Sequence, residues 1–190
     1  AVLKPRKVLL TAPTSRSTSA RSQVRRFGCI ICRKRTVLRS QSAFWDEISP
    51  DLDAVYLCNP NNPTGALYPK EILEQIVELA REHELLIFAD EIYDRLVMDG
   101  KQHISIASLA PDLCVVSFNG LSKSHLIAGY RCGWMCISGD KSRAKGYIEG
   151  INLLSSMRLC ANVPTQSVIP KALEMLDSTK EMLRAGRQGV

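Results

Sequence analysis

Residues 51–94 read DLDAVYLCNPNNPTGALYPKEILEQIVELAREHELLIFADEIYD, and this stretch decides the fold. A short apolar run ends at Cys58 and is followed by a loop with two prolines, three asparagines and a glycine. Apolar residues then recur with helical spacing over residues 72–80, and a second apolar run, 85–89, ends in Asp90. Strand, helix and strand in this order predict a right-handed βαβ unit and a parallel sheet.

The predicted helix of this unit begins near Pro69, because proline is favoured at the first helical position. Its apolar face comprises Ile72, Leu73, Ile76, Val77, Leu79 and Ala80. Open α/β sheets bind ligands outside the carboxyl ends of their strands, so the loop 59–65 and Asp90 lie at the predicted ligand edge. Two plainer interpretations stay open: the loop is an ordinary tight turn, and Asp90 caps the turn that follows it.

A second informative stretch, residues 117–134, reads SFNGLSKSHLIAGYRCGW and follows the apolar run 113–118. It places Lys123 at the mouth of a predicted buried strand, with Arg131 eight residues later. A buried lysine charge is costly unless it is solvated or used, and lysines with shifted pKa form Schiff bases with carbonyl compounds. An arginine beside glycines suits a phosphate. The alternative is a turn with two solvated cations.

The remaining elements are predicted more briefly from their apolar patterns. Three are expected, namely a strand at 133–137, a helix at 141–157 and a last amphipathic helix at 172–182. The first of these helices places Tyr147, Ile148, Ile151 and Leu154 on one face. We expect a break at 158–166, and no further element in the tail 185–190. His103, in the connection 95–112, is expected to face solvent.

Size and composition indicate one α/β domain of an ordinary soluble protein, with 190 residues and 45% hydrophobic content. Apolar runs stay far below the roughly 20 residues that span a bilayer. Seven scattered cysteines, an odd number, favour a reducing, cytoplasmic compartment over a disulfide framework. Cys29 and Cys32 have CxxC spacing, but without a second pair or a nearby histidine we expect no metal or redox site there.

Residues 1–43 form a basic, Arg- and Ser-rich segment that differs from the rest of the chain. Residues 1–45 hold 11 of the 25 Lys and Arg and none of the 19 Asp and Glu, so the remainder is mildly acidic. A short strand is expected at 7–11, whereas residues 14–43 show no sustained helical or strand period.

Three interpretations of residues 14–43 compete. A targeting peptide is rich in Arg and Ser and poor in acids, but it would begin at the N-terminus. A nucleic-acid-binding arm fits the charge, although no recognition helix or interleaved aromatic residues accompany it. We favour the third interpretation, that the segment does not encode native structure, as an out-of-frame stretch would produce. Resequencing the coding DNA tests this, and an intact frame would exclude it.

Motifs in the main body resemble those of the class I pyridoxal-phosphate-dependent aminotransferases of fold type I. They are Asn59–Gly65, Ala89–Tyr93, and Ser122-Lys123 with Arg131–Trp134. The sequences of residues 118–123, 144–150 and 156–164 most resemble those of the bacterial alanine aminotransferases. The resemblance, over residues 44–175, implies an α/β fold with a mostly parallel sheet and flanking helices in three layers. Residues 44–190 would be part of the large, cofactor-binding domain.

The resemblance also implies a cofactor and the residues that react with it. Lys123 would hold pyridoxal 5'-phosphate as a Schiff base and carry a proton between the substrate's α-carbon and the cofactor. Asp90 would pair with the ring nitrogen and strengthen the electron sink. Asn62 and Tyr93 would hydrogen-bond the 3-oxygen of the ring.

Phosphate binding is implied for Arg131, with a hydroxyl contributed by Ser122. The chain departs from the family pattern at Gly120, where many members carry a serine. The glycine turn and the stacking aromatic residue of the family are not recognisable before residue 50. Family members are longer, so the small domain, with the arginine that binds the substrate's α-carboxylate, is expected beyond residue 190.

The implied function is transamination between an amino acid, with alanine expected, and 2-oxoglutarate, by a cytoplasmic homodimeric enzyme of amino-acid metabolism. A carbon–sulfur lyase of the same fold type shares the cofactor motifs, but would release pyruvate without a keto-acid acceptor. A transcription regulator with a basic DNA-binding N-terminus would show salt-sensitive DNA binding. A further possibility is that this 190-residue chain is a fragment that cannot turn over by itself.

Overall fold

The structure of the chain is a computed structural model and describes residues 7–11, 30–31 and 52–188. In these parts of the chain, strands form one sheet in the order β2-β1-β3-β4-β5-β6. They are β1 Lys7–Thr11, β2 Ile30–Ile31, β3 Leu52–Cys58, β4 Leu86–Asp90, β5 Val115–Gly120 and β6 Gly133–Ser138. All neighbouring strands run parallel except β5 and β6, which are antiparallel. The predicted βαβ unit and mostly parallel sheet are confirmed.

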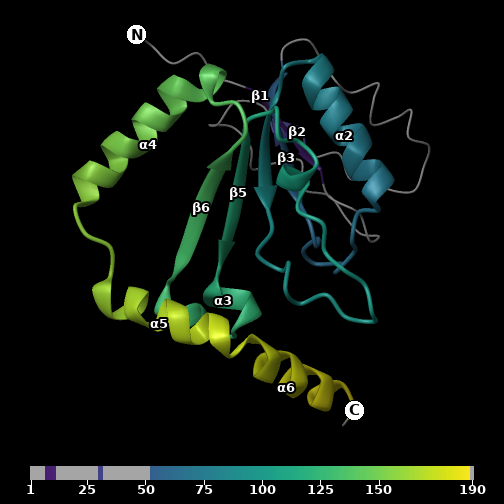
Figure 1. Cartoon of the computed structure of the whole chain (residues 1–190), viewed down its shortest axis with the longest axis vertical. Coiled ribbons are helices and arrows are strands. Elements are labelled where there is room, and N and C mark those ends of the chain that lie inside the picture. Colours follow the sequence, from purple (N-terminus) through teal and green to yellow (C-terminus); the bar gives the residue numbers. More distant parts are fainter. Residues whose placement is uncertain (1–6, 12–29, 32–51, 189–190) are drawn as a thin grey trace.

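Helices flank this sheet and cross one end of it (Figure 1). They are α2 Lys70–Glu82, α3 Leu121–Ser124, α4 Lys145–Arg158, α5 Val163–Glu174 and α6 Leu176–Gln188. Helices α3 and α5 lie at the end of the sheet that β5 reaches, and α4 runs along the side of β6 (Figure 1). Within the described residues, no helix combines the length and the apolarity needed to cross a membrane.

Helix α2 covers one face of the sheet because its apolar stripe matches the helical period. Its buried side chains, Leu73, Ile76, Val77 and Ala80, join the inward-facing residues of β3, β4 and β5 in one core cluster. Full burial of each large aliphatic side chain stabilises the fold by about 1.5–3 kcal/mol. Pro69 lies immediately before the helix, one position earlier than expected. The cluster fixes β3 and β4, whose carboxyl ends carry the predicted site.

The opposite face of the sheet is covered by aromatic side chains. Phe88 of β4 stacks on Phe118 of β5 at 6.3 Å between ring centroids, and Tyr147 of α4 meets Phe88 edge-on at 5.7 Å. Successive side chains of a strand point to opposite faces. Asp90 therefore shares the face of Phe88, at the carboxyl end of β4, and not the face that α2 covers.

The C-terminal part differs from the expected pattern in three ways. Helix α4 begins at Lys145 rather than 141, and Leu154, expected on its packed face, is 66% exposed. The expected break is shorter, because Asn162 caps α5 by accepting a hydrogen bond from the Thr165 backbone, and Pro164 is tolerated in the first turn. What the apolar pattern predicted as one last helix is two, α5 and α6.

The tail was also predicted wrongly, since α6 continues through residues 185–188. The sequence there contains a glycine, which disfavours a helix by about 1 kcal/mol, but alanine, arginine and glutamine around it are good helix formers. The local preference for a helix therefore outweighs the one glycine.

The predicted strand at 7–11 is confirmed as β1, which pairs in parallel with β3. A two-residue strand, Ile30–Ile31, pairs with β1 inside the segment 14–43, where no sustained strand pattern was expected. The other residues of 14–43, including Cys29 and Cys32, lie outside the described residues. Apart from β1 and β2, so does the region before residue 50 where the family's glycine turn was sought.

Gly120 is required by the close approach of β5 and β6. A Cβ atom at this position would lie 2.7 Å from the Cys132 carbonyl oxygen and 2.9 Å from the Gly133 Cα. Both atoms belong to the backbone, so the strands must shift to admit a side chain. Gly120, where many family members carry a serine, is thus explained by the close pairing of β5 and β6 in this chain.

We predict that Gly120→Ser lowers the free energy of unfolding by about 1–3 kcal/mol, because the serine Cβ overlaps backbone atoms. Chemical denaturation measures the effect. The matched control is Gly146→Ala in α4, where nothing lies within 4 Å of the added Cβ. That change should stabilise the helix by about 0.5–1 kcal/mol. A Gly120→Ser chain as stable as the unmodified one would refute the close approach.

Candidate active site

The carboxyl ends of β3, β4 and β5 meet at one edge of the sheet, where Cys58 pairs in register with Asp90 and Asp90 with Phe118. Strand β6 begins at the same edge, because its first residue pairs with Gly120. Every predicted site residue ends a strand here or lies on a segment that leaves or reaches this edge. These residues are Asn62, Asp90, Tyr93, Ser122, Lys123 and Arg131.

Both carboxylate oxygens of the half-buried Asp90 are held by neighbours. The Tyr56 hydroxyl donates to Oδ2 at 2.8 Å, and the Ile92 backbone N–H donates to Oδ1 at 3.3 Å. Burial, followed by the hydrogen bond to Asp90, raises the pKa of Tyr56, so the phenol remains a donor. Asp90 does cap the following turn, as the plainer interpretation held. It is also a preoriented carboxylate with lone pairs left to accept from a cation.

Tyr56 is a site residue that the sequence reasoning missed. It lies in β3 two residues before Cys58, and Cys58 is the register partner of Asp90. Residues two apart in a strand share a face, so Tyr56 and Asp90 point to the same side of the sheet. The sequence did offer one signal for this residue: Tyr56 carries a hydroxyl within a mostly apolar run, and the next predicted strand ends in the carboxylate of Asp90.

Lys123 lies on the single turn of α3, with its amine exposed. Its Nζ is 5.8 Å from the centre of the Tyr93 ring, so the structure brings these two predicted residues together. The turn itself is anchored: Leu121 is fully buried and its N–H donates to the Cys132 carbonyl at 3.1 Å. Ala172 of α5 packs against both residues. An anchored backbone thus presents an exposed amine at the edge of the sheet.

The two predicted phosphate ligands, Ser122 and Arg131, lie at the same edge of the sheet but differ in their exposure to solvent. Ser122 is half-buried beside Lys123. Arg131 is exposed, and its Nη1 donates to the Ala128 carbonyl of its own turn at 3.0 Å. Its backbone is left-handed, with φ of 53°. The guanidinium is therefore available at the surface, although it is bonded locally rather than to another predicted site residue.

Asn62 is exposed and shares a cavity of about 390 Å³ with Tyr93. Apolar side chains line the same cavity, among them Leu67, Leu96 and Met98. The loop 59–65 that carries Asn62 is closed by backbone hydrogen bonds from Asn61 to Ala66 and from Gly65 to Asn61. The cavity lies within the range of about 300–1,000 Å³ typical of small-molecule sites.

The prediction for His103 was wrong, because this side chain is only 11% exposed. Its Nε2 lies 3.1 Å from the Asn59 carbonyl oxygen and 3.9 Å from Glu91 Oε1. Burial lowers the pKa of His103 and raises the pKa of the buried Glu91. The connection folds inward because Ile106, three residues later, is fully buried against the core that α2 covers.

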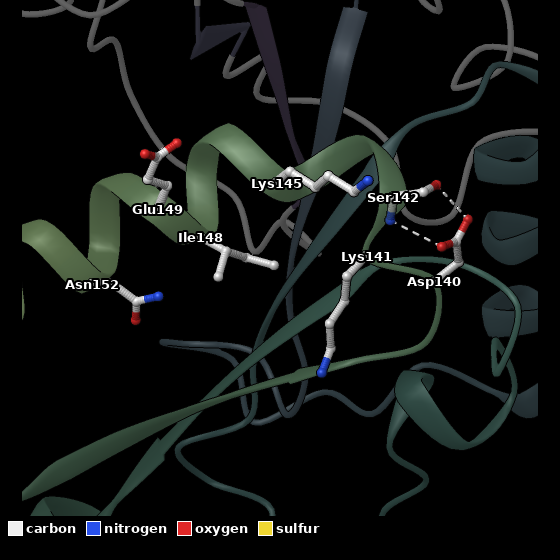
Figure 2. Close-up of a pocket in the computed structure, with 7 residues that line it drawn as sticks. All are labelled: Asp140, Lys141, Ser142, Lys145, Ile148, Glu149 and Asn152. Atoms are coloured by element: carbon white, nitrogen blue, oxygen red, sulfur yellow. Dashed lines mark hydrogen bonds between the residues drawn. The ribbon is translucent and has the colours of Figure 1, made fainter.

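A second cavity, of about 520 Å³, lies along the first turns of α4 (Figure 2). It is lined by Asp140, Lys141, Ser142, Lys145, Ile148, Glu149 and Asn152. Asp140 is satisfied within its own turn, since the Ser142 backbone and hydroxyl donate to it at 2.9 and 2.7 Å (Figure 2). None of the predicted site residues borders this cavity. Among the residues that the structure describes, no cluster of His, Cys, Asp and Glu could hold a metal.

The groups at the sheet edge fit pyridoxal phosphate. An amine suits its aldehyde, a preoriented carboxylate suits its ring nitrogen, and a phenol with an amide suits its ring oxygen. A guanidinium and a hydroxyl suit its phosphate. Lys123 and Asp90 supply the first two groups, and both lie at the carboxyl edge of the sheet.

Comparison with known proteins supports the same chemistry. The family model described as aminotransferase class I and II matches residues 6–188. The glutamate-pyruvate aminotransferase AlaA of Escherichia coli K12 is 55% identical over 140 residues, which are 74% of this chain and 35% of that protein. The chain therefore spans about a third of that relative's length.

Solved structures agree with this comparison. An aminotransferase from Escherichia coli superposes with a TM-score of 0.67 at 56% identity, over 70% of this chain and 33% of that one. An alanine aminotransferase from Pyrococcus furiosus gives 0.69 at 38% identity, over 75% of this chain and 36% of that one. The predicted fold, part of a fold type I large domain, is confirmed.

Proposed function

The chain belongs to the class I and II aminotransferases, and on this premise we propose that it transfers the amino group of an amino acid, with alanine as donor, to 2-oxoglutarate. Relatives named glutamate-pyruvate aminotransferase and alanine aminotransferase support this choice of substrates. The observation that carries the proposal is the approach of Lys123 Nζ to the Tyr93 ring, 5.8 Å, at the edge where Asp90 ends β4.

Enzymes of this family depend on pyridoxal 5'-phosphate, which when bound supplies an electron sink for the carbanion at the amino acid's α-carbon. Lys123 would hold the cofactor covalently until the amine of the substrate takes its place, and the freed Lys123 amine would then act as the general base that accepts the proton from that α-carbon. The anchored turn of α3 keeps the amine in place for both tasks. Reach and mobility come from the four-carbon side chain of lysine, which is exposed here.

The other site residues bind and orient. Asp90, held by Tyr56 and the Ile92 N–H, accepts a charge-assisted hydrogen bond from the ring nitrogen. Asn62 and Tyr93, which line one cavity, would donate to the ring oxygen. Phosphate binding falls to Arg131 and Ser122, which lie on segments at the same edge of the sheet.

A homodimer is part of the proposal. Exposed apolar side chains gather on the end of α4 and the start of α5, where Met157 is 74% and Val163 68% exposed. Leu153, Leu154 and Leu159 extend this surface. Exposed apolar patches of this kind mark protein interfaces. We also propose a reducing, cytoplasmic location, which is supported by the five free cysteines among the described residues.

The test is a transamination assay on the purified chain with pyridoxal phosphate. Pyruvate should form from alanine only when 2-oxoglutarate is present, with glutamate in equal amount. Pyruvate released from a β-thio amino acid without any acceptor would instead assign a carbon–sulfur lyase. Bound cofactor without turnover on either substrate would reject the activity for this chain, while leaving the cofactor site in place.

A further inference from the structure

Asn59 connects four segments around the candidate site. It is almost fully buried, and its N–H donates to the Asp90 carbonyl at 3.0 Å. Its side-chain oxygen accepts from the Tyr68 N–H at 3.1 Å, just before α2. Its own carbonyl lies 3.1 Å from His103 Nε2. The ends of β3 and β4, the approach to α2 and the connection 95–112 thus meet at one residue.

His103 must be the donor in this last contact. A carbonyl oxygen can only accept, so Nε2 carries the hydrogen. Two charged groups face the ring: Glu91, 3.9 Å from Nε2, and Asp94. Glu91 Oε1 also accepts from the Ile106 N–H at 3.2 Å. The connection is therefore bonded both to the loop 59–65, through His103, and to the residue after Asp90, through Ile106.

We propose that His103 is a positioning residue for the cofactor site, which holds the loop 59–65, and with it Asn62, against the strand end that carries Asp90. This inference rests on the proposed function. Besides the bonds of Asn59, the Cys58 thiol at the strand end donates to the Pro60 carbonyl at 3.5 Å, a weak sulfur hydrogen bond. The Asn61–Ala66 and Gly65–Asn61 backbone bonds, and the Thr64 hydroxyl that donates to Asn61 Oδ1, close the loop on itself. Removing the imidazole leaves the buried Asn59 carbonyl without its donor, which is unfavourable and favours displacement of the loop towards water.

The test uses His103→Leu and His103→Gln. Leucine removes the donor, whereas glutamine keeps a side-chain N–H near the position of Nε2. His83→Gln is the matched control, because His83 is exposed at the end of α2. We expect His103→Leu to weaken pyridoxal phosphate binding about three- to thirtyfold, and His103→Gln to recover most of it. Spectroscopic titration with the cofactor measures this.

A second readout needs no cofactor. Amide hydrogen exchange at Asn61 and Gly65 should accelerate by a similar factor in His103→Leu and return towards the original rate in His103→Gln. If the unmodified chain binds no cofactor, the proposed function is overturned. The exchange measurement still tests whether His103 holds the loop 59–65 in place. A lowered melting temperature with unchanged loop exchange and unchanged cofactor affinity would overturn the positioning role.

If His103→Leu does not fold, the pair His103→Gln and His103→Asn carries the test. Asparagine is too short to reach the Asn59 carbonyl from the same backbone, so it should bind the cofactor more weakly than glutamine and exchange faster at Gly65. Equal affinities and equal exchange rates for the two variants would overturn the inference.

Discussion

Replacing Lys123 with alanine is expected to abolish covalent attachment of pyridoxal phosphate and to lower kcat by at least about a thousandfold. The substitution removes the amine that, in the proposed function, holds the cofactor and accepts the substrate's α-proton. It leaves Leu121 and its bond to Cys132, which anchor the turn, untouched. The fold should therefore survive, and near-identical thermal unfolding of the variant and the unmodified chain checks this.

The matched control for this prediction is Lys145→Ala at the start of α4, which removes another exposed lysine. Covalent attachment and turnover should be unchanged in that variant. The assignment of Lys123 would be contradicted if Lys123→Ala retained covalent cofactor and measurable turnover, or if Lys145→Ala lost both.

Asp90→Asn is expected to lower kcat/KM by about 100- to 1000-fold, because a neutral amide no longer stabilises the protonated ring nitrogen. The amide has nearly the shape of the carboxylate, and its oxygen can still accept from the Tyr56 hydroxyl. Packing should thus be preserved while the charge is lost. Steady-state kinetics with alanine and 2-oxoglutarate measures the change, with kcat falling more than KM rises.

A graded companion and a control sharpen this second prediction. Tyr56→Phe removes one hydrogen bond to Asp90 and keeps the ring, so a two- to tenfold loss is expected, or about 0.5–1.5 kcal/mol. Asp112→Asn removes an exposed carboxylate that pairs with Arg81, and should leave activity unchanged. Equal losses for Asp90→Asn and Asp112→Asn would speak against a role for Asp90 at the ring nitrogen.

The parts of the fold that were predictable are those governed by period and chain order. Two short apolar runs, ending at Cys58 and Asp90, with a helical apolar stripe between them, are sufficient to predict a parallel sheet. The same reasoning places Asp90 at the ligand edge, because a strand that ends in a carboxylate must deliver it there. Lys123 is placed at the same edge because it follows the next predicted strand, and Arg131 because it precedes the strand predicted after that.

The contacts that the sequence could not predict depend on three-dimensional packing. Tyr56 meets Asp90 only through the register of β3 and β4, which no local pattern encodes. His103 is buried because the connection 95–112 folds back over Asn59, drawn in by Ile106. A lone histidine in a polar loop gives no sign of this. The interpretation of residues 14–43 as out of frame, and the small domain expected beyond residue 190, stay predictions.

The most direct test of the central claim is borohydride reduction of the purified chain with pyridoxal phosphate, followed by peptide mass mapping. The proposed site predicts a visible absorption band that reduction removes, and a single cofactor label on Lys123. Absence of the band, or label spread over exposed lysines such as Lys141 and Lys171, would contradict the claim that this chain assembles the cofactor site.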